Sequence, residues 1–277
     1  MSDGSRHVRT LSGPEVATLV GWAAAEGWNP GIGDAAAFRA ADPEGFLGAF
    51  VDDAFVAGIS AVRYGASFGF IGLYICRPEF RGRGHGRSVW DAGMARLAGR
   101  TIGLDGVPEQ QANYAGKGFV KAYETVRLSG RPDLGAAAGR TVGEASFEKI
   151  AALDRVCFPE ERRAFLATWI KPPRVFRALM EGGRLVGYGV LRRCVADCKI
   201  GPLFAGSGDA ALAILADLVA EADGPVQIDV PVTQPHFRDA LVALGMTPGF
   251  TTARMYRGPA PVVDAGKVFG ITTLELG

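Results

Sequence analysis

The chain alternates short apolar runs with amphipathic stretches, and the order of these runs in the first half returns in the second half. In each half, two apolar strands joined by a tight polar turn are followed by a third strand. The matching segments are residues 45–63 with 175–193, and residues 68–75 with 197–204. Self-similarity of this kind predicts one supersecondary unit that is used twice.

Each half begins with a helix, and after its third strand continues with a helix, a strand, a second helix and a closing strand. The expected helices include residues 14–25, 86–97, 147–157 and 209–220, and the expected strands include residues 101–107, 121–128, 226–232 and 250–256. Strands and helices mixed in this order imply an α/β fold with two tandem mixed-sheet domains and flanking helices. The C-terminal residues 271–276 are expected to form a last strand.

A length of 277 residues favours two compact units over a single domain. Residues 131–140 are rich in Gly, Ala and Pro, which is the composition of an interdomain linker. We therefore expect a first domain over residues 1–130 and a second over residues 141–277. Two packed copies in one chain would form a pseudo-dimer, so the molecule is expected to be a monomer or a weak homodimer.

The composition excludes several kinds of partner. Lys and Arg number 30 against 29 Asp and Glu, so no overall field favours nucleic acid or an anionic membrane. The chain has neither an apolar stretch of about 18 residues, as a membrane helix needs, nor a signal-peptide pattern, and a cytoplasmic protein is expected. The cysteines are scattered, and Cys194 and Cys198 have no second ligand pair nearby, so neither a disulfide framework nor a metal site is expected.

The candidate chemistry concentrates where an apolar strand ends at Cys76 and the next helix begins. Pro78 breaks the strand, and glycines then alternate with basic residues. The segment reads Arg81, Gly82, Arg83, Gly84, His85, Gly86 and Arg87. Glycines allow backbone N–H groups to turn inward, and a helix N-terminus presents about four unpaired N–H groups. Together they predict a binding site for a diphosphate.

Other interpretations of this loop fit less well. A dinucleotide-binding loop needs Gly-x-Gly-x-x-Gly, but the third glycine position falls on Arg87. The phosphate loop of nucleotide hydrolases needs Gly-Lys followed by Ser or Thr, which this loop lacks. A Gly-rich turn with only a structural role stays open, although three arginines beside three glycines favour an anion site.

The spacing Arg-x-x-Gly-x-Gly, from Arg81 to Gly86, resembles the acyl-CoA pyrophosphate loop of the GNAT superfamily of acetyltransferases. The sequence from Tyr114 to Phe119 is similar to the Tyr-x-x-x-Gly-Phe ending common in that superfamily, and residues 22–31 resemble its substrate-side helix and turn. The second half shares the strand order without these motifs. The whole chain therefore resembles the tandem-GNAT acetyltransferases, with one departure at position 107, where valine replaces the asparagine of many relatives.

The resemblance implies an acyltransferase, more narrowly an N-acetyltransferase, that uses acetyl-CoA as its co-substrate. Backbone groups of the motif strand would hold the pantetheine arm and the acyl carbonyl, and the N–H groups from Arg81 to Gly86 would hold the diphosphate. The motif-strand residues are Tyr74, Ile75 and Cys76. The residues expected at the edge of the coenzyme site are Arg87, Ser88 and Asn113, of which Asn113 could instead face water.

Tyr114 matches the general acid of the family, which protonates the departing thiolate and is typically worth about 10² to 10⁴ in rate. A tyrosine that only packs at a helix end is the alternative. The base that deprotonates the amine is assigned to Glu26 or Asp105, although most carboxylates are surface or capping groups. The residues expected at the acceptor are Trp22, Trp28 and Asn29, of which the tryptophans could instead be core residues.

The second half lacks the chemistry of the first. Residues 205–209, the counterpart of the glycine loop, are short and contain no arginine. Asp209 is expected to cap the following helix, and Leu241 replaces Tyr114 and has no proton to give. We expect this half to be an inactive copy that walls the acceptor pocket or covers an edge of the sheet.

The leading hypothesis is an enzyme that acetylates a primary amine of a small molecule or peptide by direct attack in a ternary complex. Two alternatives stay open, a protein lysine acetyltransferase and a non-catalytic acyl-CoA sensor. No residue type in the sequence indicates a particular amine.

Overall fold

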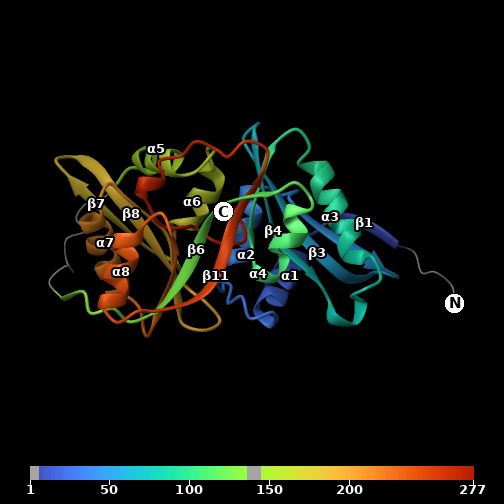
Figure 1. The fold of residues 1–277 in the computed structure, drawn as a ribbon, viewed down its shortest axis with the longest axis horizontal. Coiled ribbons are helices and arrows are strands. Elements are labelled where there is room, and N and C mark those ends of the chain that lie inside the picture. Colours follow the sequence, from blue (N-terminus) through green and yellow to red (C-terminus); the bar gives the residue numbers. More distant parts are fainter. Residues whose placement is uncertain (1–5, 136–144) are drawn as a thin grey trace.

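The computed structural model describes residues 6–135 and 145–277, so residues 136–140 of the expected linker lie outside the described part. Helices cover both faces of one long mixed sheet, and the two halves of the chain occupy its two ends (Figure 1). The α/β class and the repeated order of elements predicted from the sequence are confirmed.

Apart from the strand that begins the first half and the strand that ends the second, the two halves contain the same α-helices and strands in the same order. The first half contains β1 (Arg6–Thr10), α1 (Gly13–Ala25), α2 (Asp34–Ala41), β2 (Phe46–Val51), β3 (Ala54–Tyr64), β4 (Phe68–Cys76), α3 (His85–Arg96), β5 (Thr101–Gly106), α4 (Pro108–Ala115) and β6 (Val120–Gly130). The second half contains α5 (Phe147–Cys157), α6 (Arg163–Trp169), β7 (Val175–Glu181), β8 (Arg184–Arg193), β9 (Cys198–Ala205), α7 (Gly208–Ala220), β10 (Val226–Pro231), α8 (Pro235–Ala243), β11 (Thr247–Arg257) and β12 (Val268–Gly270).

The first hairpin of each half closes through a two-residue turn with the same backbone geometry. Asp52 and Asp53 join β2 to β3 with φ of 46° and 65°, and Gly182 and Gly183 join β7 to β8 with φ of 55° and 75°. Positive φ at both central residues matches the right-handed twist of the flanking strands, and Asp and Gly tolerate it best. The two predicted hairpins are therefore confirmed down to their turns.

The closing strands of the two halves are exchanged. The strand order is β1-β2-β3-β4-β5-β11-β6-β10-β9-β8-β7, so β6 of the first half pairs with β10, and β11 of the second half pairs with β5. Figure 1 shows β6 and β11 side by side in the middle of the molecule, where they pair with each other. Each half thus completes the other, and the two predicted sheets are joined into one.

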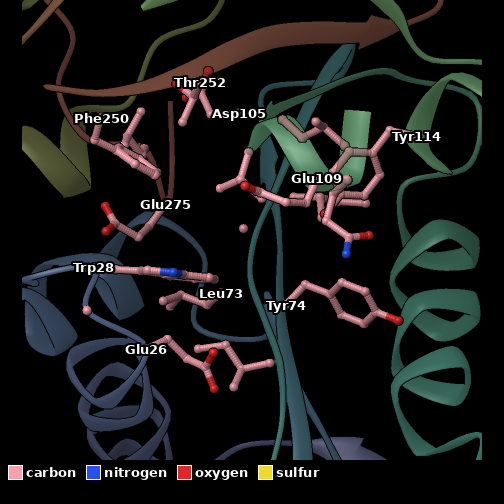
Figure 2. A pocket seen from close by; sticks show the side chains of 18 of the residues that line it. Glu26, Trp28, Leu73, Tyr74, Asp105, Glu109, Tyr114, Phe250, Thr252 and Glu275 are labelled. Carbon is pink, nitrogen blue, oxygen red and sulfur yellow. The ribbon is translucent and has the colours of Figure 1, made fainter. Parts of the chain in front are cut away.

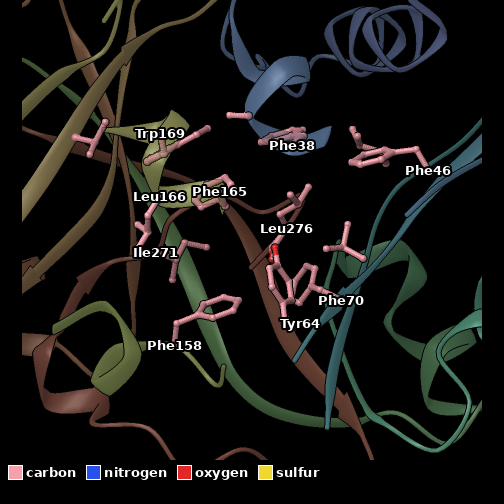
Figure 3. Packing of buried hydrophobic residues seen from close by; sticks show 14 of the residues in the cluster. Phe38, Phe46, Tyr64, Phe70, Phe158, Phe165, Leu166, Trp169, Ile271 and Leu276 are labelled. Atoms are coloured by element: carbon pink, nitrogen blue, oxygen red, sulfur yellow. Dashed lines mark hydrogen bonds between the residues drawn. The ribbon is translucent and has the colours of Figure 1, made fainter. Parts of the chain in front are cut away.

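The face of the sheet beneath α1, α2, α5 and α6 carries a core that both halves share. Phe38, Phe46 and Phe70 of the first half and Phe165 and Trp169 of the second belong to the same buried cluster (Figure 3). On the opposite face, α3 covers one separate cluster, and α7 and α8 cover another. Because a single core spans the junction, the two halves are packed as one body.

The expectation of a last strand over residues 271–276 is wrong. The last strand is β12, which pairs antiparallel with β9, and the chain after it turns across the shared core. The Ser60 hydroxyl donates to the Glu275 carbonyl at 3.3 Å, and the Tyr64 hydroxyl donates to the Leu276 carbonyl at 3.1 Å. Gly72 leaves the space for this approach, because a Cβ there would collide with the Glu275 backbone.

Some features are absent from residues 6–135 and 145–277. No helix in these ranges is long and apolar enough to cross a membrane. No group of three or more His, Cys, Asp or Glu side chains there could hold a metal ion. The four cysteines, all of which lie in these ranges, are free thiols.

Candidate active site

The strands β4 and β5 separate halfway along their length. They pair in parallel from Phe68 opposite Thr101 to Ile71 opposite Leu104, and β4 then continues alone on that side. A bulge follows, because two residues of β4, Leu73 and Tyr74, lie opposite one residue of β3. Leu73 has a φ of 44°. The bulge turns the end of β4 away from its neighbour and leaves its backbone groups available to a ligand.

A cavity of about 800 Å³ opens where these strands separate (Figure 2). Its wall combines the end of α1, the second half of β4, the end of β5, and α4 with residues of β6, β11 and the C-terminal tail. The predicted site residues that line it are Glu26, Trp28, Tyr74, Ile75, Cys76, Arg81, Asp105, Asn113 and Tyr114. The sequence thus identified much of the wall that the first half contributes.

The glycine loop leads directly into the N-terminus of α3. Gly82 and Gly84 have φ of 75° and 85°, and no atom lies within 4 Å of the position a Cβ would take on either. These conformations favour glycine, and the open space lets a ligand approach the backbone closely. His85 is buried, packs edge-on against Phe80 at 6.1 Å between ring centroids, and has a pKa lowered by burial. His85 therefore stabilises the loop as a neutral ring.

The arginines of the loop have protein partners of their own. Arg81 pairs with Glu26 and donates from Nε to the Cys76 carbonyl at 2.9 Å, which ties the loop to the end of α1. Arg87 lies 3.6 Å from Asp91 on the exposed side of α3. Two of the three arginines that favour an anion site in the sequence are therefore held in ion pairs within the protein.

The remaining polar groups of this segment also help to shape it. The Arg83 guanidinium lies 5.8 Å from the centre of the Phe80 ring. The Ser88 hydroxyl donates to the His85 carbonyl at 2.7 Å within the first turn of α3. Anion binding at this end of α3 would depend chiefly on backbone N–H groups, which a helix leaves unpaired in its first turn.

Tyr114 reaches the cavity from α4. Its ring stacks on Trp90 of α3 at 5.6 Å between centroids and 20° between planes. Gly106 makes room for it, since a Cβ there would come within 3.1 Å of the Tyr114 ring. Burial raises the pKa of Tyr114 to about 12. The phenol is therefore neutral and holds a proton that it can donate.

Two further predicted residues flank Tyr114 on the cavity wall. Tyr74 points along the wall towards α3 in Figure 2, and its hydroxyl lies 3.0 Å from the position a Cβ on Gly86 would take. Burial raises the pKa of Tyr74. The Asn113 amide donates to Gln110 on the same helix at 3.1 Å. These groups form the side of the cavity that lies beside the start of α3.

Asp105 forms an ion pair that is repeated elsewhere in the molecule. Arg254 of β11 donates from Nε and Nη2 to the two carboxylate oxygens of Asp105, both at 2.8 Å. Arg127 of β6 donates in the same way to Asp229, at 2.8 and 2.9 Å. In each pair the arginine is on the exchanged strand, and the acid is the residue directly opposite it on the neighbouring strand. Burial raises the pKa of Asp105, and the Arg254 charge opposes that rise.

Two of the expected acceptor residues lie away from the cavity wall. Both polar atoms of the Asn29 amide bond to Ala196 of the second half, at 2.7 and 2.8 Å. Trp22 stacks on Phe55 at 4.3 Å between centroids and packs against the shared core. Asn29 thus connects the two halves, and Trp22 packs against the shared core. Trp28 alone of the three lines the cavity.

The counterpart of the cavity in the second half is filled by the chain itself. β9 and β10 pair in parallel only as far as Ile200 opposite Ile228, and a bulge follows in β9 as it does in β4. β12 then pairs with β9 beyond this point, and the Ile271 N–H donates to the Asp229 carbonyl at 3.0 Å. A strand of the protein thus occupies the place where a ligand would enter.

The helix that follows this filled groove also differs from α3. The expectation that Asp209 caps it is wrong, because the cap is Ser207, whose hydroxyl accepts from the Ala210 N–H at 3.2 Å. Ser207 directly precedes the helix in an extended conformation, whereas Asp209 lies within the first turn. The N–H group that would face a phosphate is therefore bonded to a side chain.

Sequence reasoning missed the part of the cavity wall that arrives from far along the chain. Arg127 comes from β6, Phe250 and Thr252 come from β11, and Leu274 and Glu275 come from the C-terminal tail. No local motif distinguishes these residues. They reach the cavity only through the strand exchange and the path of the tail.

The separated strands, the glycine loop at a helix N-terminus and the half-buried tyrosine define a class of acyltransferase, and the chain belongs to the GNAT family, with a GNAT domain in each half. Residues 15–119 match the family described as "Acetyltransferase (GNAT) family", and residues 150–270 match the one described as "Acetyltransferase (GNAT) domain".

Particular relatives resemble the chain over most of its length. It is 33% identical to the holothin acyltransferase of Pseudoalteromonas sp. (strain SANK 73390), over 92% of this chain and 89% of that protein. It is 26% identical to the uncharacterized N-acetyltransferase YitH of Bacillus subtilis (strain 168), over 75% and 76%. A solved structure of a putative acetyltransferase from Pyrococcus horikoshii has the same fold, with a TM-score of 0.82, 21% identity, and coverage of 100% and 97%.

Proposed function

We propose that this acyltransferase moves an acetyl group from acetyl-CoA to a primary amine of a small molecule or peptide, by direct attack in a ternary complex. The observation that carries the proposal is one continuous cavity with a donor side and an acceptor side. Tyr114 and the bulge at Leu73 lie on the donor side, and Trp28 and Phe250 line the other. Both substrates could therefore meet without a covalent enzyme intermediate.

The donor side fits an acyl-CoA. Gly82 and Gly84 open the backbone in front of α3 to a diphosphate, and the unpaired end of β4 offers N–H and C=O groups to an extended amide chain. When bound, acyl-CoA supplies the thioester whose carbonyl carbon the amine attacks. The residues from Tyr74 to Cys76 would orient it, and Arg87, Ser88 and Asn113 would lie near its edge.

Tyr114 would act as the general acid that protonates the departing sulfur. Its pKa of about 12 supports this role, because the phenol keeps its proton at every pH at which the protein works. Trp90 holds the ring in place, so a proton donor is available without a side-chain rearrangement.

Glu26 and Asp105, the two acids that the sequence suggests as the general base, both form ion pairs with arginines. Asp105 repeats the pairing that Asp229 makes in the half whose groove is filled, which favours a structural role in fixing the exchanged strands. Glu26 pairs with Arg81, which favours a role in positioning the glycine loop. We therefore propose that each positions other parts of the site.

The second half would be a catalytically inactive copy that walls the acceptor side. β12 in its groove and Ser207 at its helix start support this role. We further propose that the chain works as a monomer, with domains at residues 1–130 and 141–277 that exchange their closing strands, because the exchange already joins two GNAT sheets edge to edge.

The test is thiol release from acetyl-CoA across a panel of primary amines, peptides and lysine-containing proteins, beside calorimetry of acetyl-CoA binding. We expect micromolar or tighter binding and thiol release with small amines or short peptides. Tight binding without thiol release for any amine would instead favour an acyl-CoA sensor. Release only with folded proteins would favour a protein lysine acetyltransferase.

A further inference from the structure

The C-terminal tail delivers a buried carboxylate to the cavity. Glu275 lines the wall and is 5% exposed, and its Oε2 atom has no hydrogen-bond partner among the described residues. In Figure 2 the carboxylate lies between the side chains of Trp28 and Phe250. An ionised group is costly to bury without a partner. A carboxylate kept in this state is therefore a candidate for ligand binding.

The backbone of the tail places Glu275 beside the reacting end of the cavity. Its carbonyl packs against Gly72, directly before the bulge of β4, and accepts a hydrogen bond from Ser60. The bulge contains Tyr74, one of the residues that in the proposed function orient the acyl-CoA thioester. Glu275 and the thioester would thus be held by adjacent stretches of backbone.

The carboxylates that line the cavity wall favour a cationic ligand. The wall contains four carboxylates and two guanidinium groups, namely Glu26, Asp105, Glu109, Glu275, Arg81 and Arg127. Glu26 and Arg81 pair with each other, and Asp105 and Arg127 have the partners Arg254 and Asp229. The excess charge on the wall is therefore negative and belongs to Glu109 and Glu275.

The positive groups near Glu275 are bonded to other partners. Arg127, Arg192 and Lys199 couple electrostatically to its carboxylate. Arg127 donates to Asp229, Arg192 donates to the Thr272 carbonyl at 3.1 Å, and Lys199 donates to the Trp28 carbonyl at 2.9 Å. They surround the Glu275 carboxylate with positive charge, and none of these three hydrogen bonds is made to it.

We propose that Glu275 binds the amino group of the acceptor and takes its proton, and that the acceptor is a small cationic primary amine whose apolar body lies against Trp28 and Phe250. The inference rests on the proposed function, since it assigns the base and the acceptor class of that same site. Aromatic rings beside a carboxylate suit such a ligand, because rings attract both apolar groups and cations. The inactive half thus supplies a catalytic residue to the active one.

The proton balance of the reaction can be written with these groups. Glu275 takes one proton from the ammonium, and the freed nitrogen lone pair then forms the C–N bond. The C–S bond breaks, and sulfur keeps the electron pair of that bond. Tyr114 gives its proton to sulfur, and the second proton of the nitrogen returns to Tyr114 through solvent. The proton on Glu275 leaves to water, so an ammonium and a thioester yield an amide, a thiol and one proton.

The deciding experiment compares the parent with Glu275→Gln, using 2-phenylethylamine as a cationic acceptor and aniline as one that is neutral at pH 7. We expect kcat/KM for 2-phenylethylamine to fall by at least about 100-fold, because a positioned base is worth about 10² to 10⁴. Aniline, which carries no proton to remove before attack, should lose much less. Acetyl-CoA affinity should stay within about twofold.

Two further measurements keep the inference open to refutation. The melting temperature of Glu275→Gln should equal or exceed that of the parent, since the variant removes a buried unpaired charge. Glu181→Gln, the same change at an exposed residue of β7, is the matched control. Equal turnover of both amines by Glu275→Gln and parent would overturn the inference, and so would a lowered melting temperature with a proportional loss on both amines.

Failure of the proposed function would look different. In that case the parent would bind acetyl-CoA and release no thiol with any amine. Calorimetry of 2-phenylethylamine with the coenzyme-bound parent and with Glu275→Gln would still decide the role of the carboxylate. Weaker binding to the variant supports Glu275 as the amine site, and equal binding removes it.

Discussion

Tyr114 offers the cleanest test at the scale of single residues. Replacing it with Phe keeps the stacking on Trp90 and removes only the proton, so kcat should fall by about 10² to 10⁴ while acetyl-CoA affinity changes little. Because the group acts in its protonated form and its pKa is about 12, it should cause no loss of activity as pH rises to about 11. Steady-state kinetics across pH and calorimetry measure both effects.

Tyr123→Phe provides the control for that experiment. Tyr123 is a half-buried tyrosine of β6 whose pKa is also raised by burial, but it does not line the cavity. Its variant should keep the turnover of the parent. If Tyr114→Phe did the same, the phenol would have no part in the mechanism.

The repeated ion pairs allow a matched comparison of Asp105→Asn and Asp229→Asn. Each change leaves a buried arginine, Arg254 or Arg127, without its carboxylate, and losing one partner of a buried pair typically costs about 3–5 kcal/mol. Urea denaturation should show similar losses in the free energy of unfolding for both variants. Turnover per folded molecule should also be similar. Abolished turnover in Asp105→Asn alone would identify Asp105 as the base.

At the scale of elements, the junction of the glycine loop and α3 is the part most open to test. Gly84→Ala forces a side chain into a left-handed conformation, which costs about 1–2 kcal/mol, and should weaken acetyl-CoA binding about tenfold by moving the N–H groups in front of α3. Gly99→Ala meets the same strain at φ of 79° in the turn after α3, again with no atom near the Cβ. Calorimetry should find its coenzyme affinity unchanged.

Equal weakening in the two glycine variants would mean that the effect comes from lost stability rather than from the binding loop. Thermal melts of both proteins provide the comparison. A normal affinity in Gly84→Ala would remove the backbone of this loop from coenzyme binding.

Most elements could be predicted because their signals are local. The two-residue turns at Asp52 and Gly182, the breaking of β4 near Pro78 and the glycines before α3 act through nearby backbone geometry, and the structure follows them closely. The prediction of a strand in the C-terminal tail was wrong because the conformation of the tail does not depend on local signals. The run from Ile271 to Leu276 has the composition of a strand, but contacts with the core decided its conformation.

At the scale of the whole molecule, the strand exchange predicts that neither half folds alone. A fragment of residues 1–135 would lack β11 beside β5, and a fragment of residues 145–277 would lack β6 beside β10, so each would expose open strand edges and part of the shared core. Each fragment alone should show no cooperative thermal transition. Co-expression of the two should restore a cooperative melt and acetyl-CoA binding.

The first fragment is the informative one, since it contains the glycine loop and Tyr114. A cooperative melt and normal coenzyme affinity of residues 1–135 alone would contradict the exchange as a requirement for folding. Circular dichroism and calorimetry on the fragments and on the co-expressed pair make the comparison.

The sequence by itself determined the repeated α/β unit, the glycine loop from Arg81 to Gly86, and the tyrosine of α4. Turns and glycine conformations depend on neighbours along the chain, so a sequence pattern can predict them. Only the tertiary structure decided that β6 and β11 change places, that β12 fills the second groove, and that Glu275 reaches the first. These features arise from contacts between residues that lie far apart in the sequence, and no local spacing encodes such contacts.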